Sequence, residues 1–247
     1  MHVQAAQIKA EPYRWPHDSS LSKEKTALIV IDMQRDFCEQ GGYLSHQGYD
    51  SSLTRAIIPN IQRLLRTFRS REYHIYHTRK GHRPDLADLP SRESYRSKNN
   101  ASGLGIGDVG PLGRLLIRGE AGHDIIRELY PQEGEPIVDK PGKSAFANTD
   151  FDLLLKVNGI KNLIICGVTT DVCVHSTMRD ANDRGYDCLL VEDACAASTE
   201  DLHRFAVLLT KVEGGVFGAV ASVSDVLGAM NGTSQAELHR NKTQQQQ

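Results

Sequence analysis

The sequence predicts an α/β fold, a single three-layer α/β/α domain around a six-stranded, mostly parallel sheet. Two observations lead to this prediction. Short apolar runs alternate with segments of helical spacing along most of the chain, and the first, residues 26–31, reads as one continuous apolar run. A strand of that kind is buried on both faces, as in parallel sheets. Alternating strands and helices then form right-handed βαβ units, with helices on both faces.

The remaining elements follow from the same patterns in chain order. Strands are expected over 73–77, 136–139, 163–167, 188–191 and 216–220, and helices over 53–68, 149–158, 171–184 and 202–211. Thr170 or Asp171 is placed to cap the helix that runs to about residue 184. Residues 79–121 are rich in Gly, Pro, Ser and Arg and predict a long irregular stretch. A loop of that length in a compact domain is usually functional or an oligomer contact.

The ends of the chain differ from the domain between them. Residues 1–25 are expected to form an extended N-terminal arm, residues 26–230 the domain, and residues 231–247 a flexible polar tail. The arm lacks the apolar segment of a signal peptide, and no apolar run approaches the ~20 residues of a membrane helix. We therefore expect a cytoplasmic protein without a membrane partner. The formal net charge of −2 offers no electrostatic case for nucleic acid.

Three polar residues are predicted at the carboxyl ends of strands, where open α/β sheets bind their ligands. Asp32 ends the first strand, Lys140 follows the third, and Cys173 begins the helix after the fourth. A thiolate is favoured at a helix start and beside an ammonium, and a nearby carboxylate can take the thiol proton. From position alone, Cys173 could instead be a buried helix cysteine and Asp32 a turn residue. Lys143 could also take the place of Lys140.

The other cysteines indicate no disulfide framework or zinc ribbon. Their number is odd with Cys173 included, and no C-x-x-C pair occurs. We expect them to be small buried apolar residues. They are Cys38, Cys166, Cys188 and Cys195.

Three segments in this order resemble the motifs of the isochorismatase-like cysteine hydrolases, a family that includes nicotinamidases. They read LIVIDMQRDF at 28–37, KPGKSAF at 140–146 and CGVTTDVC at 166–173. The resemblance covers about residues 25–225 and implies the Rossmann-like fold of that family. It also implies a triad of Asp32 as acid and base, Lys140 rather than Lys143, and Cys173 as nucleophile.

The resemblance implies the chemistry as well. Cys173 attacks the carbonyl of a small amide, the backbone N–H groups of Thr169 and Cys173 hold the oxyanion, and Asp32 protonates the departing ammonia. Water then hydrolyses the thioacyl-enzyme, without a cofactor. The match also implies a cis peptide between Val168 and Thr169.

Nicotinamidases of this family bind a metal through an Asp-x-His pair. Here Lys80 stands in the place of that aspartate and His82 in that of the histidine. A protonated lysine is no ligand and repels a cation. We therefore predict no catalytic metal, and take His74, His77 and His82 as loop and strand histidines.

Further segments look like the branch of biuret and triuret hydrolases, among them residues 77–90 and 214–218. This predicts cleavage of a C–N bond in a small ureido or carbamoyl compound. Ureidoacrylate amidohydrolases and carbamate ester hydrolases (urethanases) are the alternatives with the same triad. A catalytically silent binding member is the alternative outside enzymes. The family resemblance points to a homo-oligomer, a tetramer or a dimer, with the tetramer favoured. A dinucleotide-dependent oxidoreductase is disfavoured, because no G-x-G-x-x-G follows the first strand.

Five residues are candidates for contact with the substrate. Lys80 stands where this branch usually has Glu, and Glu213 where biuret hydrolases have Gln. Their opposite charges suggest either a pair across the pocket or two independent surface changes. Phe37 and Phe146 are expected to be apolar pocket walls or ordinary core residues, and Thr170 is the fifth candidate.

Overall fold

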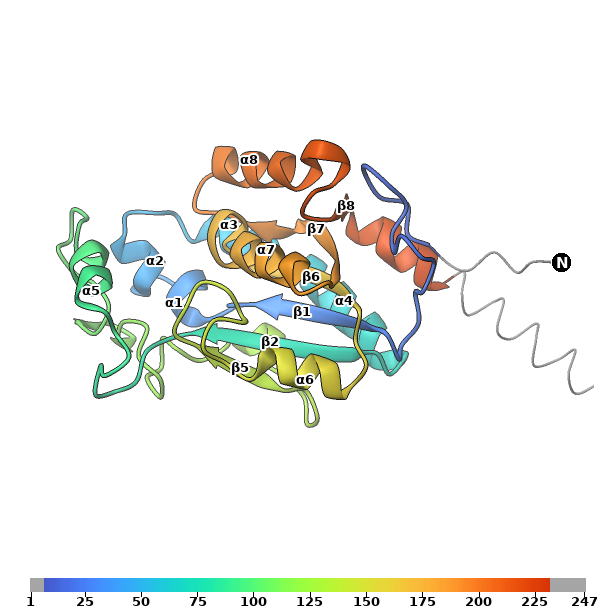
Figure 1. The fold of residues 1–247 in the computed structure, drawn as a ribbon. Helices are drawn as coiled ribbons and strands as arrows, with labels where there is room; N and C mark the ends of the chain where they lie inside the picture. The colour runs from blue at the N-terminus through green and yellow to red at the C-terminus, as the bar shows by residue number, and fades with distance from the viewer. Residues whose placement is uncertain (1–6, 232–247) are drawn as a thin grey trace, which may run out of the picture.

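The computed structural model describes residues 7–231 and confirms the predicted three-layer α/β/α architecture (Figure 1). Its six-stranded sheet has the order β5-β2-β1-β6-β7-β8, and all neighbouring pairs are parallel. The strands are β1 (Thr26–Ile31), β2 (His74–Lys80), β5 (Ile137–Lys140), β6 (Asn162–Val168), β7 (Asp187–Ala196) and β8 (Ala219–Ala221). The chain order reverses between β1 and β6, which makes the space beyond their carboxyl ends the expected ligand site.

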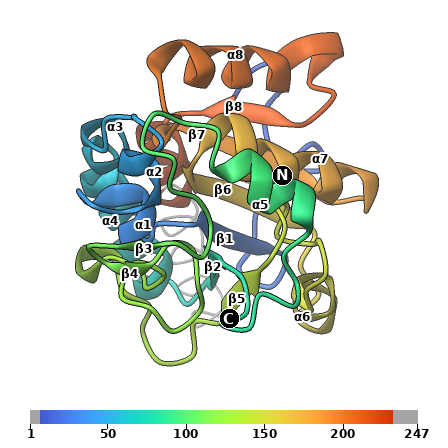
Figure 2. The same cartoon turned by 90° about the vertical axis from the view of Figure 1, so that its left-hand side faces the viewer.

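Helices cover both faces of the sheet (Figure 2). Viewed onto the carboxyl ends of the strands, α4 (Ile58–Ser70) lies on one side, and α6 (Phe151–Val157) and α7 (His175–Asp183) lie on the other. The shorter helices α1, α2 and α3 lie on the side of α4, and α8 lies beyond β7 and β8. Their bounds are α1 (Arg35–Cys38), α2 (Tyr43–His46), α3 (Ser52–Ala56) and α8 (Glu200–Lys211).

The prediction of one helix over 53–68 is wrong in one respect, because this segment forms two helices, α3 and α4. The break falls at Ile57, and Pro59 lies in the first turn of α4. A proline has no N–H to donate to the carbonyl four residues earlier, so it starts a helix more readily than it continues one.

The stretch over 79–121 is more ordered than predicted. It contains α5 (Ser91–Ser97) and a hairpin of β3 (Val109–Gly110) and β4 (Gly113–Arg114). Figure 2 shows α5 crossing in front of the carboxyl ends of the central strands. This segment therefore forms a cover over the end of the sheet where the ligand site is expected.

The described part of the N-terminal arm packs against its own domain. Ile8 and Trp15 are fully buried and bridge one another, and Glu11 pairs with Val220 of β8. Tyr13 donates its hydroxyl to Asp187 at 3.0 Å. The arm thus covers an otherwise open edge of the sheet. The predicted polar tail lies outside the described residues from residue 232 onward.

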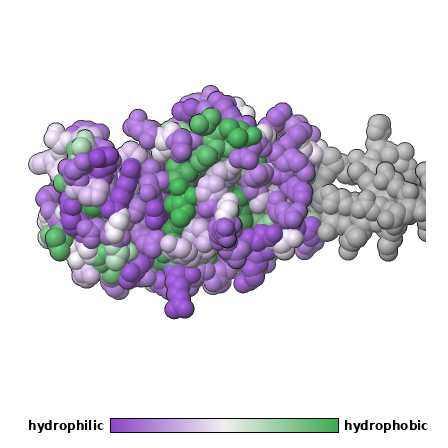
Figure 3. All heavy atoms as spheres, turned by 90° about the horizontal axis from the view of Figure 1, so that it is seen from below, coloured by the Kyte–Doolittle hydropathy of each residue, from purple (hydrophilic) through white to green (hydrophobic). Residues whose placement is uncertain are grey.

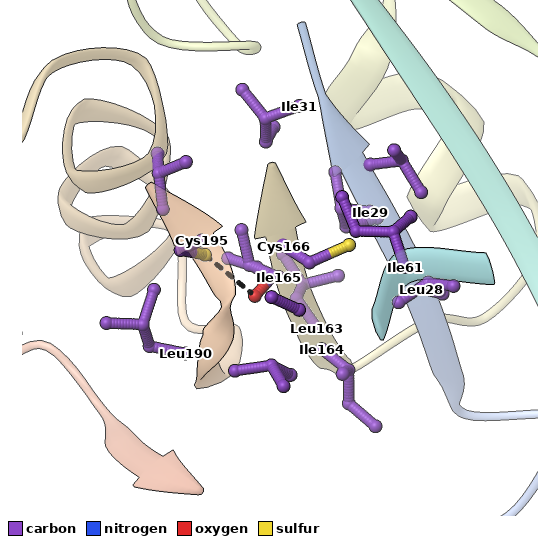
Figure 4. Close-up of a cluster of buried hydrophobic side chains, with 14 of the residues drawn as sticks. Leu28, Ile29, Ile31, Ile61, Leu163, Ile164, Ile165, Cys166, Leu190 and Cys195 are labelled. Atoms are coloured by element: carbon purple, nitrogen blue, oxygen red, sulfur yellow. Dashed lines mark hydrogen bonds between the residues drawn. The ribbon is translucent and has the colours of Figure 1, made fainter. Parts of the chain in front are cut away.

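The core is centred on β1 and β6, every residue of which is buried. Figure 4 shows side chains of both strands packed with Ile61 of α4 and with Leu190 and Cys195 of β7. The apolar runs of the sequence correspond to these doubly covered strands. Cys38, Cys166, Cys188 and Cys195 are free and buried, as predicted, and Cys173 is buried as well.

The surface carries some apolar area besides. The face seen in Figure 3 has an apolar stripe among mainly polar residues. Within residues 7–231, no helix combines the length and the apolar character that crossing a membrane requires.

The tight approach of β6 to β1 can be tested at Gly167. Its φ is 114°, and a Cβ there would lie 2.1 Å from the carbonyl oxygen of Ile31. We expect Gly167→Ala to lower the free energy of unfolding by about 3 kcal/mol through strain and overlap. Urea denaturation measures the change.

Gly228→Ala is the matched control, because Gly228 lies in the last described helical segment, residues 223–231, where an added Cβ meets nothing within 4 Å. The control should leave stability unchanged or raise it by about 0.5–1 kcal/mol, since glycine weakens a helix. Equal effects at the two positions would show that the close approach is absent.

Candidate active site

The structure brings Asp32, Lys140 and Cys173 together at the carboxyl ends of the strands. Asp32 directly follows β1, Lys140 is the last residue of β5, and Cys173 lies in η2 (Thr170–Val174), the turn after β6. The Cys173 thiol interacts with both the Asp32 carboxylate and the Lys140 ammonium. Three strand ends therefore supply one cluster at the point where the chain order reverses.

Asp32 and Lys140 form a fully buried ion pair. Nζ of Lys140 lies 2.7 Å from Oδ2 of Asp32, and neither side chain is exposed. Burial acts to lower the pKa of Lys140, but the charges of Asp32 and Cys173 outweigh it and raise that pKa. The ammonium also donates to the carbonyls of Gly142 and Lys143 at 3.2 and 3.0 Å. Lys140 therefore stays a cation beside the cysteine.

The second oxygen of Asp32 has a partner of its own. Thr78 of β2 donates its hydroxyl to Oδ1 of Asp32 at 2.6 Å and accepts from the Asp32 backbone N–H at 3.2 Å. Asp32 also has a φ of 49°, which is uncommon for a residue other than glycine. The carboxylate is thus held in a single orientation by residues of β2 and β5.

Cys173 is buried, and this burial is the main influence on its thiol. Burial raises the pKa of Cys173 to about 12; Lys140 acts to lower it and Asp32 to raise it further. The resting group is therefore a thiol, not the thiolate expected from a helix start and a nearby lysine. Deprotonation then requires a base, and the Asp32 carboxylate is in contact with it.

The other residues of the first motif build the loops around this cluster. The side chain of Gln34 joins the backbone of Lys80 to that of His123, with contacts of 2.6–3.0 Å. Asp36 accepts from the backbone N–H groups of Tyr43 and Leu116 at 3.1 and 2.9 Å. Asp36 therefore connects the segments that contain Tyr43 and Leu116. Of the two aspartates, Asp32 is the one that interacts with Cys173.

Thr169 lies beside Cys173, and the peptide between Val168 and Thr169 is cis, as the resemblance implies. The carbonyl of Thr169 accepts from the N–H groups of Val172 and Val174, both at 3.1 Å. Thr169 and Cys173 line the same cavity. Their two N–H groups are therefore candidates for an oxyanion hole, and this assignment stays a prediction.

Cys173 lines a cavity of about 260 Å³, just below the usual range for ligand pockets. Its apolar wall comes from α1, α2 and the cover segment, and includes Phe37, Tyr43 and Leu116. Its charged wall carries Lys80, Glu93, Arg96 and Lys143. The predictions for Phe37 and Lys80 therefore agree with their positions.

Lys80 is the most buried cation of this wall. Its ammonium contacts Nε2 of His82 at 2.8 Å, donates to the carbonyl of Pro141, and lies 3.5 Å from Oε1 of Glu93. Burial lowers the pKa of Lys80 to about 8; Glu93 acts to raise it and Lys143 to lower it. At neutral pH the side chain is thus mainly charged.

The residues around His82 do not suit the metal that nicotinamidases of this fold bind. An ammonium can only donate, so Lys80 takes the lone pair on Nε2 of His82 that a metal would need. The other ring nitrogen of His82 faces Asp88 at 3.3 Å. Within residues 7–231, no group of three or more histidine, cysteine, aspartate or glutamate side chains is placed to hold an ion.

Three predicted contact residues lie outside the cavity lining. Phe146 packs in the core, with ring centroids 4.9 Å from Phe151 and 5.8 Å from Tyr186, so the alternative of core packing is correct. The hydroxyl of Thr170 contacts Nδ1 of His203 at 2.9 Å, and Thr170 caps no helix.

Glu213 is exposed in η3 (Val212–Gly214) with a φ of 53°. The prediction of a Lys80–Glu213 pair is wrong for this chain, because the carboxylate beside Lys80 belongs to Glu93.

The sequence reasoning missed Glu93, Arg96 and Tyr43. Glu93 and Arg96 belong to α5, a helix of seven residues inside the stretch taken as irregular. Their spacing of three residues was the available signal, since it places both on one helix face. Only the position of α5 over the strand ends brings that face to the cavity.

The burial of Lys80 predicts a pH dependence of stability. The pKa of Lys80 is about 8 in the folded chain against an ordinary value of 10.5, so the folded state binds fewer protons between these values. Wild type should therefore gain stability relative to Lys80→Met as the pH rises through this window. From pH 7 to 9.5 we expect a relative gain of about 2 kcal/mol. Urea unfolding of both proteins measures it, and a constant difference would contradict a depressed pKa.

Comparison with curated proteins finds several ureidoacrylate amidohydrolases among the relatives of this chain. The RutB enzyme of Azorhizobium caulinodans is 33% identical over 213 residues, covering 85% of this chain and 92% of the relative. That of Serratia proteamaculans is 35% identical over 180 residues, covering 72% and 73%. These matches support an amidohydrolase and do not single out the biuret branch.

Solved structures agree with this result. A cysteine hydrolase from Pseudomonas syringae pv. phaseolicola superposes with a TM-score of 0.73 at 28% identity, covering 86% of this chain and 95% of that one. An isochorismatase-like hydrolase from Alkaliphilus metalliredigens gives a TM-score of 0.64 at 31% identity, with coverages of 83% and 98%. The model of the isochorismatase domain family matches residues 26–225. The chain is therefore a hydrolase of the isochorismatase family.

Proposed function

We propose that this chain is a cysteine amidohydrolase that removes ammonia from a small ureido compound through a thioacyl-enzyme. The observation that carries the proposal is the interaction of the Cys173 thiol, which lines a small cavity, with a buried Asp32–Lys140 ion pair. A nucleophile, a base and a cation are the three groups that such a reaction needs.

In the first half-reaction, Asp32 takes the proton of Cys173 while the sulfur attacks the ureido carbonyl. Lys140 stabilises the negative charge on the sulfur, and the N–H groups of Thr169 and Cys173 donate hydrogen bonds to the oxyanion. The C–N bond to the terminal amino group then breaks, and Asp32 returns the proton to the leaving nitrogen. Ammonia and an S-carbamoyl enzyme result.

In the second half-reaction, Asp32 takes a proton from a water molecule that attacks the thioester carbonyl. The C–S bond breaks, the thiol is regenerated, and the product is a carbamate. Asp32 suits both steps because Lys140 and Thr78 hold its two oxygens in one orientation.

Among ureido compounds we favour ureidoacrylate or a close analogue over biuret. Relatives at 33–35% identity over 72–85% of this chain are ureidoacrylate amidohydrolases. A cavity of about 260 Å³ is consistent with a substrate of this size. Biuret and ethyl carbamate remain the alternatives with the same triad.

Replacement of the sulfur is the direct test of the mechanism. We expect Cys173→Ala and Asp32→Asn to lower kcat by more than about a thousandfold, because each removes a member of a group that acts as a unit. Ammonia release measures turnover, and mass spectrometry after acid quench should show an acyl adduct on Cys173 in wild type.

Cys188→Ala is the matched control, since it removes a buried sulfur of β7 outside the cavity. It should leave the rate within a few-fold of wild type, allowing for a modest loss of stability. Turnover that persists in Cys173→Ala would contradict the mechanism.

A panel of substrates tests the assignment of the class. We expect the largest kcat/KM with 3-ureidoacrylate or 3-ureidopropionate, lower values with biuret and ethyl carbamate, and the lowest with nicotinamide. A preference for biuret or ethyl carbamate would replace the favoured substrate and keep the mechanism. A reactive Cys173 without turnover of any ureido, carbamate or amide compound would favour a silent binding member.

A further inference from the structure

The charged wall of the cavity places three cations around one carboxylate oxygen. Nζ of Lys143, Nζ of Lys80 and an Nη atom of Arg96 lie 2.5, 3.5 and 3.8 Å from Oε1 of Glu93. The other carboxylate of the lining, Asp171, belongs to η2 and interacts with His203 of α8. The wall formed by α5 and its neighbours therefore has more positive charge than Glu93 can balance.

Arg96 has hydrogen-bonding capacity that the described residues do not use. Its distance of 3.8 Å from Glu93 exceeds that of a hydrogen bond, and its guanidinium donates to no other residue within 7–231. The side chain is 53% exposed and lines the cavity. A guanidinium presents a planar fork of donors that matches a carboxylate.

The two lysines of this wall are already engaged. Lys143 pairs with Glu93, and Lys80 contacts His82 and Pro141. They contribute positive potential, which a bound anion would experience in a partly enclosed cavity with little screening.

The charged wall and Cys173 lie within interaction distance of one another. The pKa of Tyr43 is raised chiefly by burial, and it is influenced both by Arg96 and Glu93 and by Cys173. Lys80 likewise interacts with Glu93 and with Cys173. Arg96 and Cys173 also line the same cavity of about 260 Å³, so a small ligand whose carbonyl meets the sulfur can reach Arg96 with its other end.

We propose that Arg96 binds the carboxylate of an anionic ureido substrate, with Lys80 and Lys143 providing the surrounding positive charge. Arg96 is then a residue that determines specificity, and the enzyme prefers ureido acids to neutral ureas. The inference rests on the proposed function, because it identifies the residue that binds the same substrate at the end opposite its ureido group.

The test compares 3-ureidopropionate with the neutral alcohol in which CH₂OH replaces its carboxylate. Wild type should have the higher kcat/KM for the acid. Arg96→Gln should lower kcat/KM for the acid by about 10- to 100-fold, as expected for lost hydrogen bonds to a charged group. The value for the alcohol should change by less than about threefold, and Arg96→Lys should recover part of the preference.

Arg92→Gln is the matched control. Arg92 lies on the same helix, is exposed and does not line the cavity, so its loss should leave the ratio of acid to alcohol unchanged. If Arg96→Gln lowers kcat/KM equally for the acid and the alcohol, Arg96 has a structural role and the proposal is overturned. A wild type without preference for the acid would overturn it as well.

A binding measurement separates this inference from the proposed function. In calorimetry, Cys173→Ala should bind the acid more tightly than the alcohol, and Cys173→Ala with Arg96→Gln should lose that difference. If Cys173→Ala retains turnover, the proposed mechanism fails while the binding preference still decides the role of Arg96. Equal binding of acid and alcohol by Cys173→Ala overturns the anion site whatever the mechanism.

Discussion

The buried ion pair between Lys140 and Asp32 is the interaction on which the rest of the site depends. The two residues come from β5 and β1, which are separated in the sheet by β2. Two charges removed from water are tolerated only when their remaining hydrogen-bonding groups also have partners. Thr78 of the intervening strand and the carbonyls of the 140–143 loop supply them. Satisfying this pair therefore fixes the order of three strands and the path of the loop after β5.

That loop connects the ion pair to the charged wall of the cavity. The carbonyl of Lys143 accepts from Lys140, and the side chain of Lys143 pairs with Glu93. Lys80 approaches the same carboxylate from β2. The helix α5, which makes few other contacts with the sheet, is thus linked to the strand ends by charge. The ammonium of Lys80 stabilises a carboxylate of α5 beside it. Arg96 of the same helix then lies at the cavity.

Much of the fold and part of the site could be predicted before any coordinates. The apolar runs of β1 and β6 are buried on both faces. A continuous apolar run favours a strand position that is covered on both sides. Polar residues at the ends of such strands meet at one edge of a parallel sheet, so Asp32, Lys140 and Cys173 were found together. The position of Phe146 could not be decided from its motif, because neighbours in a motif do not share a direction. The Phe146 ring turns into the core, while the Lys140 ammonium a few residues earlier turns to Asp32.

The sequence by itself thus determined the alternation of strands and helices, the burial of the central strands and which polar residues meet at the strand ends. These features depend on the pattern of polar and apolar side chains among residues close together in the sequence. That pattern is present along the whole chain. Only the tertiary structure decided that the thiol is buried, that Glu93 and not Glu213 accompanies Lys80, and that Arg96 reaches the cavity. Those outcomes depend on how a short helix from a long connecting segment lies across the strand ends, and its position is set by contacts between residues far apart in the chain.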